Sequence, residues 1–162
     1  MTTEQFNECV DLHADGVYRF ILHNLKDEEQ SRDIVQDAFE KMWMNVGNIS
    51  SEKSKSYLFT TAYHTMLDKI RRGKKQGTWD EVKEHQYSDQ GNNYSGLKQI
   101  LKDALNRLPE IQRTVIMLRD YEGYSYEEIG EITALNESQV KVYIYRARTA
   151  MKEFIGKIEN VI

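Results

Sequence analysis

The chain contains one cysteine, Cys9, and one proline, Pro109, among its 162 residues. A lone cysteine cannot form an internal disulfide, which favours a reducing compartment. No apolar run approaches the roughly 18 residues that a membrane span needs, and the first residues lack the basic and then apolar pattern of a secretory signal. The sequence therefore predicts a cytoplasmic protein with no direct membrane insertion.

An excess of positive charge is also missing, because 22 Lys and Arg stand against 26 Asp and Glu. Such an acidic chain attracts nucleic-acid phosphates weakly, so any contact with nucleic acid requires local basic patches. The four histidines and Cys9 show no metal-ligand spacing. No phosphate-binding glycine loop and no nucleophile with a neighbouring base is present. We therefore expect no metal, no cofactor and no catalytic residue.

Apolar residues recur at helical spacing along most of the chain, and no convincing alternating strand is present. They form four stripes: Phe6, Val10, Val17 and Ile21; Ile34, Val35, Ala38, Phe39 and Met42; Leu97, Leu101, Ala104, Leu105 and Leu108; and Ile111, Val115 and Leu118. These stripes predict an all-α fold with the apolar faces turned inward.

Residues 73–96 interrupt this pattern, since they include four glycines and no sustained apolar face. We interpret them as a flexible linker between two small helical domains, 1–72 and 97–162. Trp79, Val82 and Tyr87 leave open a short helix that docks on one of the domains.

Two helix-start patterns of the same design lie eleven residues apart in the C-terminal domain. Ser125 and Asn136 can each accept a hydrogen bond from free backbone N–H groups of a following helix. Three positions later, Glu128 and Gln139 can accept one in return. About two turns of helix and a tight corner at residues 133–135 fit between the two starts, which predicts a helix-turn-helix whose corner lacks the usual glycine.

The sign of the charge changes abruptly at this corner. Every charged residue from Asp120 to Glu137 is acidic, and every charged residue from Ser138 to Lys152 is basic. Helix dipoles favour acids at a helix start and bases at its end, but they do not explain so sharp a change. A helix in a DNA groove needs cations and no neighbouring carboxylates, so we interpret the second helix as the DNA reader.

A second basic segment, residues 53–75, carries seven bases and one acid. Tyr57, Phe59, Tyr63 and His64 lie among them, and the preceding loop, residues 47–51, adds small polar groups. Cations beside aromatic rings suit single-stranded nucleic acid, whose unpaired bases stack on such rings. The alternative is that the aromatic residues belong to the core and the cations to a solvated helix end.

The predicted helix 33–43 has the opposite character. With its apolar stripe inward, it presents acidic and amide side chains on its outer side. They are Asp33, Gln36, Asp37 and Glu40. A solvated acidic face is the default reading, and a protein-binding face is the alternative.

Several blocks together resemble the small extracytoplasmic-function (ECF) group of bacterial sigma factors in the sigma-70 family. The blocks are residues 33–43, 57–62 with Asp68 and 71–72, 108–110, and 123–148. The resemblance implies a non-enzymatic subunit that binds core RNA polymerase, recognises promoter DNA and helps to melt it. It also implies an inhibitory partner, an anti-sigma factor that covers both binding faces.

The resemblance assigns expected roles to three sets of residues. Asp33, Gln36, Asp37 and Glu40 bind polymerase; Asn48, Ser51, Lys53, Lys55, Tyr57, His64, Arg71 and Arg72 contact the melted −10 element; and Ser138, Gln139, Lys141, Val142, Tyr145, Arg146 and Arg148 contact the duplex −35 element. Helical steps turn Val140, Ile144, Ala147 and Met151 inward and leave the −35 set outward. Lys141 and Arg146 are the first choices for a guanine edge, and Arg148 for a backbone phosphate.

Some positions depart from the family pattern. Tyr57 stands where tryptophan is common, His64 where asparagine is common, and Val142-Tyr143 where a serine-arginine pair is common. These changes alter the contacts available to base edges. Two other functions stay open at this stage: a stand-alone helix-turn-helix regulator and an enzyme acting on nucleic acid.

Overall fold

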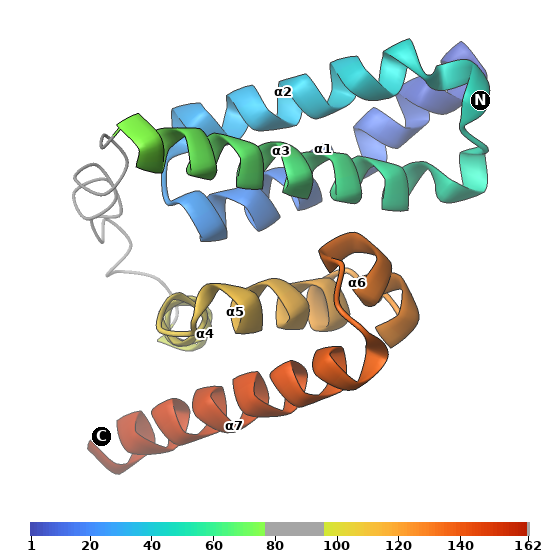
Figure 1. Cartoon of the computed structure of the whole chain (residues 1–162). Helices are drawn as coiled ribbons and strands as arrows, with labels where there is room; N and C mark the ends of the chain where they lie inside the picture. The colour runs from blue at the N-terminus through green and yellow to red at the C-terminus, as the bar shows by residue number, and fades with distance from the viewer. Residues whose placement is uncertain (77–95, 162) are drawn as a thin grey trace. The chain divides into compact units, whose positions relative to one another are not determined.

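The computed structural model describes residues 1–76 and 96–161, and these two stretches form two compact helical units. The first unit contains α1 (Thr3–Leu25), α2 (Glu28–Met44) and α3 (Ser54–Gln76), which lie side by side (Figure 1). Two short 3-10 turns, η1 (Val46–Asn48) and η2 (Ser51–Lys53), connect α2 to α3. The predicted all-α fold is confirmed.

Local signals define the hairpin of α1 and α2. Thr2 and Gln5 form a capping box, with hydrogen bonds of 2.8 and 3.1 Å. Lys26 ends α1 in the left-handed conformation with φ 59°, and the Asp27 carboxylate then accepts from the Gln30 N–H at 3.1 Å to begin α2. The chain therefore turns within two residues, which brings the apolar faces of the two helices together.

The core of the first unit lies where the three helices meet. Its fully buried side chains are Val17, Phe20, Ile21, Leu25, Ile34, Ala38, Met42, Leu58, Phe59, Ala62 and Met66. The Phe20 ring packs against the rings of Phe59 and Tyr63, at 5.6 and 6.1 Å between centroids. These aromatic contacts join α1 to α3.

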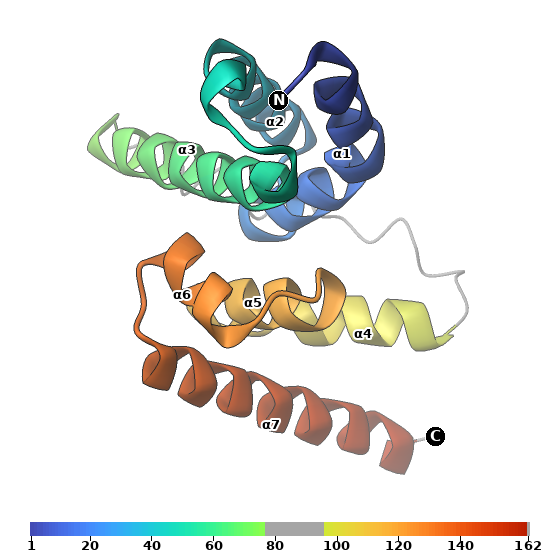
Figure 2. The same ribbon diagram turned by 90° about the vertical axis from the view of Figure 1, so that its right-hand side faces the viewer.

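The second unit contains α4 (Gly96–Asn106), α5 (Glu110–Ile116), the π-helical turn η3 (Met117–Tyr121), α6 (Tyr126–Thr133) and α7 (Glu137–Val161). Figure 2 shows α7 running along α4, α5 and α6, and all three contact it. The buried Arg113 donates to the carbonyl of Leu108 at 3.2 Å, which satisfies a backbone group near the end of α4. The contacts with α4, α5 and α6 hold one face of α7 against the unit and leave its other face outward.

Three expectations change at the ends of the elements. Helix α3 continues to Gln76 and α4 begins at Gly96, so the outer residues of the predicted linker 73–96 are helical. The remainder of that linker, with Trp79, Val82 and Tyr87, lies outside the described residues. Leu97 was expected in the core but is 67% exposed, because it occupies the first turn of α4, before the part of that helix that contributes buried residues.

Candidate nucleic-acid interface

The helix-turn-helix forms through the two predicted caps. At the start of α6, Glu128 N–H donates to the Ser125 hydroxyl at 3.1 Å, and Ser125 N–H donates to the Glu128 carboxylate at 2.9 Å. At the start of α7, the bonds between Asn136 and Gln139 measure 2.8 and 3.0 Å. Both capping interactions are therefore confirmed, and they set where each helix begins.

The corner between α6 and α7 has no glycine at the turn itself, and two other residues allow it to form. Ala134 itself adopts the left-handed conformation, with φ 61°, and its N–H bonds to the Gly130 carbonyl. A Cβ added at Gly130 would lie 2.6 Å from the backbone oxygen of Leu135. The glycine that this motif needs is thus inside α6, because close approach of the corner, and not the turn itself, demands it.

Helix α7 presents two opposite faces. Val140, Ile144 and Ala147 are buried and Met151 is half-buried, as the helical steps predict. All seven residues expected at duplex DNA are exposed: Ser138, Gln139, Lys141, Val142, Tyr145, Arg146 and Arg148. Tyr143 is half-buried between the two faces. The fold therefore presents the whole expected set along one side of one helix.

Two of the cations on α7 already have partners within the unit. Arg148 forms a two-pronged contact with the Asp120 carboxylate, and this hydrogen bond raises the pKa of the Arg148 guanidinium. Lys141 lies 3.5 Å from a Glu137 carboxylate oxygen and 5.6 Å from the centroid of the Tyr126 ring. Sequence reasoning missed Asp120 as a partner, because a contact across 28 positions leaves no local signal.

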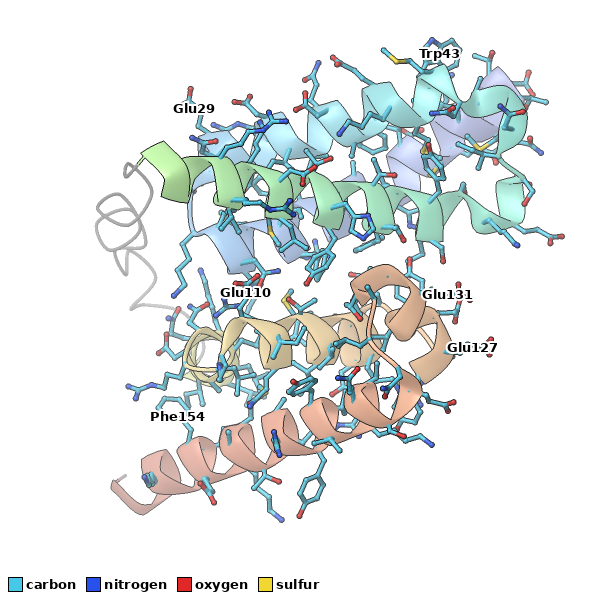
Figure 3. The ribbon with its side chains drawn as sticks, viewed as in Figure 1. Glu29, Trp43, Glu110, Glu127, Glu131 and Phe154 are labelled. Carbon is cyan, nitrogen blue, oxygen red and sulfur yellow. The ribbon has the colours of Figure 1, made fainter. Side chains whose placement is uncertain are left out.

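Acidic residues adjoin this side at one edge, where Glu137 contacts Lys141 and Asp120 contacts Arg148. Glu127 and Glu131 project outward from α6 (Figure 3). On α7 no acid occurs from Ser138 to Lys152. Between Ser138 and Lys152, the exposed side of α7 therefore combines cations with neutral side chains, as contact with duplex DNA requires.

In the first unit, the expected acidic face lies along the exposed side of α2. Asp33, Gln36 and Glu40 are exposed. Asp37 is half-buried and lies 3.5 Å from the Lys69 ammonium of α3. Three members of the set are therefore available to a partner, while Asp37 is partly neutralised within the unit.

An apolar groove of about 600 Å³ adjoins that face, between α1 and α2. Its walls include Phe6, Tyr18, Val35, Gln36, Phe39, Glu40, Trp43 and Met44. Trp43 is 48% and Met44 79% exposed near the C-terminal end of α2 (Figure 3). Phe6 and Phe39 were predicted to face the core, but both are half-buried in the wall of this groove. The centroid of the Phe6 ring lies 6.3 Å from that of Phe39 and 5.0 Å from that of Trp43, so the three rings pack together at the groove. An exposed apolar surface of this kind is typical of a protein-binding site.

The basic-aromatic segment divides between core and surface. Phe59 and Tyr63 are buried, so for these two rings the core alternative holds. Tyr57 is half-buried, and its hydroxyl accepts a 3.1 Å hydrogen bond from Asn45, which joins the end of α2 to the start of α3. His64 is exposed. Stacking surface for a base is therefore offered by Tyr57 and His64.

The polar and basic residues of this segment surround the loop between α2 and α3 and continue along α3. Asn48, Ser51, Lys53, Arg71 and Arg72 are exposed, and Lys55 is half-buried. Arg71 lies 3.4 Å from an Asp68 oxygen in an exposed ion pair, which contributes little to stability. The side chains of Lys74 and Lys75 lie outside the described residues.

Among the described residues, no group of three or more His, Cys, Asp or Glu side chains is arranged to hold a metal ion. In the described part of the chain, every helix falls short of the length or apolar character that crossing a membrane requires.

The sequence matches two protein families in the order of its units. Residues 9–76 match Sigma-70 region 2, and residues 98–151 match Sigma-70, region 4. The first match covers α2 and α3 with most of α1, and the second extends from α4 into α7. Each family therefore coincides with one compact unit.

Full-length relatives show the same likeness. The chain is 31% identical over 153 residues to the RNA polymerase sigma factor SigV of Bacillus subtilis (strain 168), covering 89% of this chain and 87% of SigV. It is 24% identical to the ECF RNA polymerase sigma factor SigM of the same organism, over 95% and 97% of the two chains.

A solved structure agrees with this likeness. The sigma factor RpoE of Bartonella quintana, solved in complex with the anti-sigma factor NepR, matches with a TM-score of 0.80 and 25% identity. The match covers 95% of this chain and 98% of RpoE.

Proposed function

This chain belongs to the sigma-70 family as an ECF-type sigma factor, and we propose that its two units divide the contacts with RNA polymerase and promoter DNA as follows. Sigma factors of this family direct RNA polymerase to promoters and initiate transcription. They are subunits of the polymerase and have no enzymatic activity of their own. The protein works in the cytoplasm, where core polymerase and promoter DNA are found.

The α2 face binds core polymerase. Asp33, Gln36 and Glu40 supply exposed polar groups along the groove between α1 and α2, and Asp37 adds a carboxylate that Lys69 partly neutralises. The neighbouring Trp43 offers an apolar anchor of the kind that dominates protein interfaces. A basic and apolar partner surface fits this combination.

The loop between α2 and α3 binds the melted −10 element. Asn48 and Ser51 supply hydrogen-bonding groups for an unpaired base, and Tyr57 with His64 supplies a stacking surface. Lys53, Lys55, Arg71 and Arg72 attract the phosphates of the single strand.

Helix α7 reads the duplex −35 element in the major groove. The observation that carries this proposal is its exposed face, on which all seven expected residues lie without an acid between Ser138 and Lys152. Arg146 is the first choice for a guanine edge, because its side chain is exposed and forms no hydrogen bond or ion pair with the described residues. Lys141, the other expected reader of a guanine edge, lies on the same edge of the face as Arg148 and contacts Glu137, so both residues suit backbone phosphates.

An anti-sigma factor controls access to these faces. Support comes from the large exposed apolar side chains of the groove, with Met44 79% exposed, and from the likeness to a sigma factor solved with such an inhibitor. A pull-down that returned only core polymerase under all growth conditions would contradict this part of the proposal.

Transcription from purified components tests the main proposal. Core polymerase with this chain should start transcription at a set of promoters that core polymerase alone ignores. A stand-alone regulator would instead bind duplex DNA tightly without polymerase, as a dimer on a palindrome. Failure of the chain to associate with core polymerase would refute the proposal.

A further inference from the structure

The outermost row of α7 is uncharged. Ser138, Val142, Tyr145 and Thr149 follow one another at steps of four, three and four residues, so they share one face of the helix. All four are exposed, with Val142 at 45% and Tyr145 at 72%. The buried residues Val140, Ile144 and Ala147 lie on the opposite side. The residues that reach farthest from the unit are therefore neutral and partly apolar.

Two of the cations, Lys141 and Arg148, stand on one side of this row, because they lie seven residues apart on the helix. Lys141 is one residue before Val142 and points toward Glu137 and the Tyr126 ring. Arg148 is turned toward Asp120 of η3. When a helix enters the major groove, its central row meets base edges and its flanks meet the phosphates. The position of Lys141 and Arg148 thus suits one sugar-phosphate backbone, and it leaves the base edges to the neutral row and to Arg146.

The side chain of Val142 restricts which base it can read. Valine has methyl groups and no hydrogen-bonding atom, and the C5-methyl of thymine is the apolar group that base edges present in the major groove. Contact between a Val142 methyl group and the thymine methyl group removes apolar surface of both from water, which favours binding. On the basis of the proposed −35 role of α7, we propose that Val142 is a specificity-determining residue that selects thymine through its methyl group, with the Tyr145 ring packed beside it.

Replacement of thymine by deoxyuridine removes that methyl and keeps the base pairing, so it tests the contact directly. The −35 element is first selected from random duplexes with the holoenzyme of this chain and core polymerase. Each selected thymine is then replaced by deoxyuridine, and holoenzyme affinity is measured. At one thymine we expect a loss of about fourfold, the value of one buried methyl group.

The Val142→Ala variant distinguishes this contact from a general effect of the base change. Its holoenzyme should lose affinity for the thymine promoter by several-fold and should no longer respond to deoxyuridine at that position. Val142→Thr keeps one methyl and should restore part of the response. Lys157→Ala, an exposed change elsewhere on α7, should behave as the unmodified chain does.

Two results would overturn the inference: a selected element without a required thymine, or an equal deoxyuridine effect in the unmodified and Val142→Ala holoenzymes. The second result would mean that a group other than the Val142 side chain responds to the methyl group. Both leave polymerase-dependent promoter selection intact, so the proposed function would stand. Absence of any polymerase-dependent selection would remove the proposed function and this inference together.

Discussion

The two units present their candidate nucleic-acid surfaces differently. In the first unit, Lys69 lies beside Asp37 and Arg71 beside Asp68, and two of the four aromatic rings among the bases are buried. In the second, the buried and exposed residues of α7 separate cleanly onto opposite faces. A helix packed on one side can present a regular row to a duplex, whereas a single strand requires only a loop and a few neighbouring side chains.

The largest effect that tests this division is expected from Glu40→Arg in the first unit. Charge reversal beside the groove should weaken binding to core polymerase by about 2 kcal/mol or more, roughly thirtyfold in Kd. Competition binding with labelled chain measures it. Glu52→Arg makes the same charge change on η2, away from the groove lining, and should retain polymerase affinity. Equal losses in both variants would refute the assignment of the α2 face.

Arg146→Ala tests the duplex reader of the second unit. Loss of a bonded guanine edge should cost about 1–3 kcal/mol, or roughly five- to 150-fold in use of promoters that depend on the −35 element. Polymerase affinity should not change. Transcription with purified components, measured alongside polymerase binding, separates the two. If both activities fell together, the division of roles between the units would be wrong.

Gly130→Ala tests whether the second unit depends on the close approach inside its corner. The new Cβ would meet the Leu135 carbonyl oxygen at 2.6 Å, and backbone must move to relieve this overlap. We expect the unit to lose about 1–3 kcal/mol of unfolding free energy, measured by thermal denaturation. Gly156→Ala in α7, where no atom lies within 4 Å of the added Cβ, should instead stabilise it by about 0.5–1 kcal/mol.

The smallest expected change concerns the Cys9 thiol, which reports on the first unit alone. Burial raises the pKa of Cys9 above the ordinary value of 9.0, and the hydrogen bond with Ser54 opposes this only in part. The buried neutral thiol therefore contributes to the free energy of unfolding below pH 9.0, and this contribution is lost as the pH rises through the raised pKa.

Alkylation at pH 8.5 measures this protection. The folded chain should react about tenfold more slowly, or slower still, than the denatured chain. The Gly130→Ala variant should show the same slow rate, because its defect belongs to the other unit. Rapid alkylation in that variant would show that the two units do not fold separately.

Features carried by neighbouring residues were predictable, and features that join distant ones were not. The capping pairs of Ser125 and Asn136 span three positions each, so their chemistry is visible in the sequence. The exposure of Trp43 and the half-buried positions of Phe6 and Phe39 depend on how α1 lies against α2, and helical periodicity alone assigned both phenylalanines to the core.

By itself, the sequence determined the helical class, the capped starts of α6 and α7, and the separation of acids from bases at their corner. These follow from hydrogen bonds and periodicities that act within a few residues. Only the tertiary structure decided that Arg148 meets Asp120, that Phe59 and Tyr63 are core, and that Gly130 makes room for Leu135. Such contacts depend on the packing of whole helices, since many arrangements share one hydrophobic pattern and only close packing selects among them.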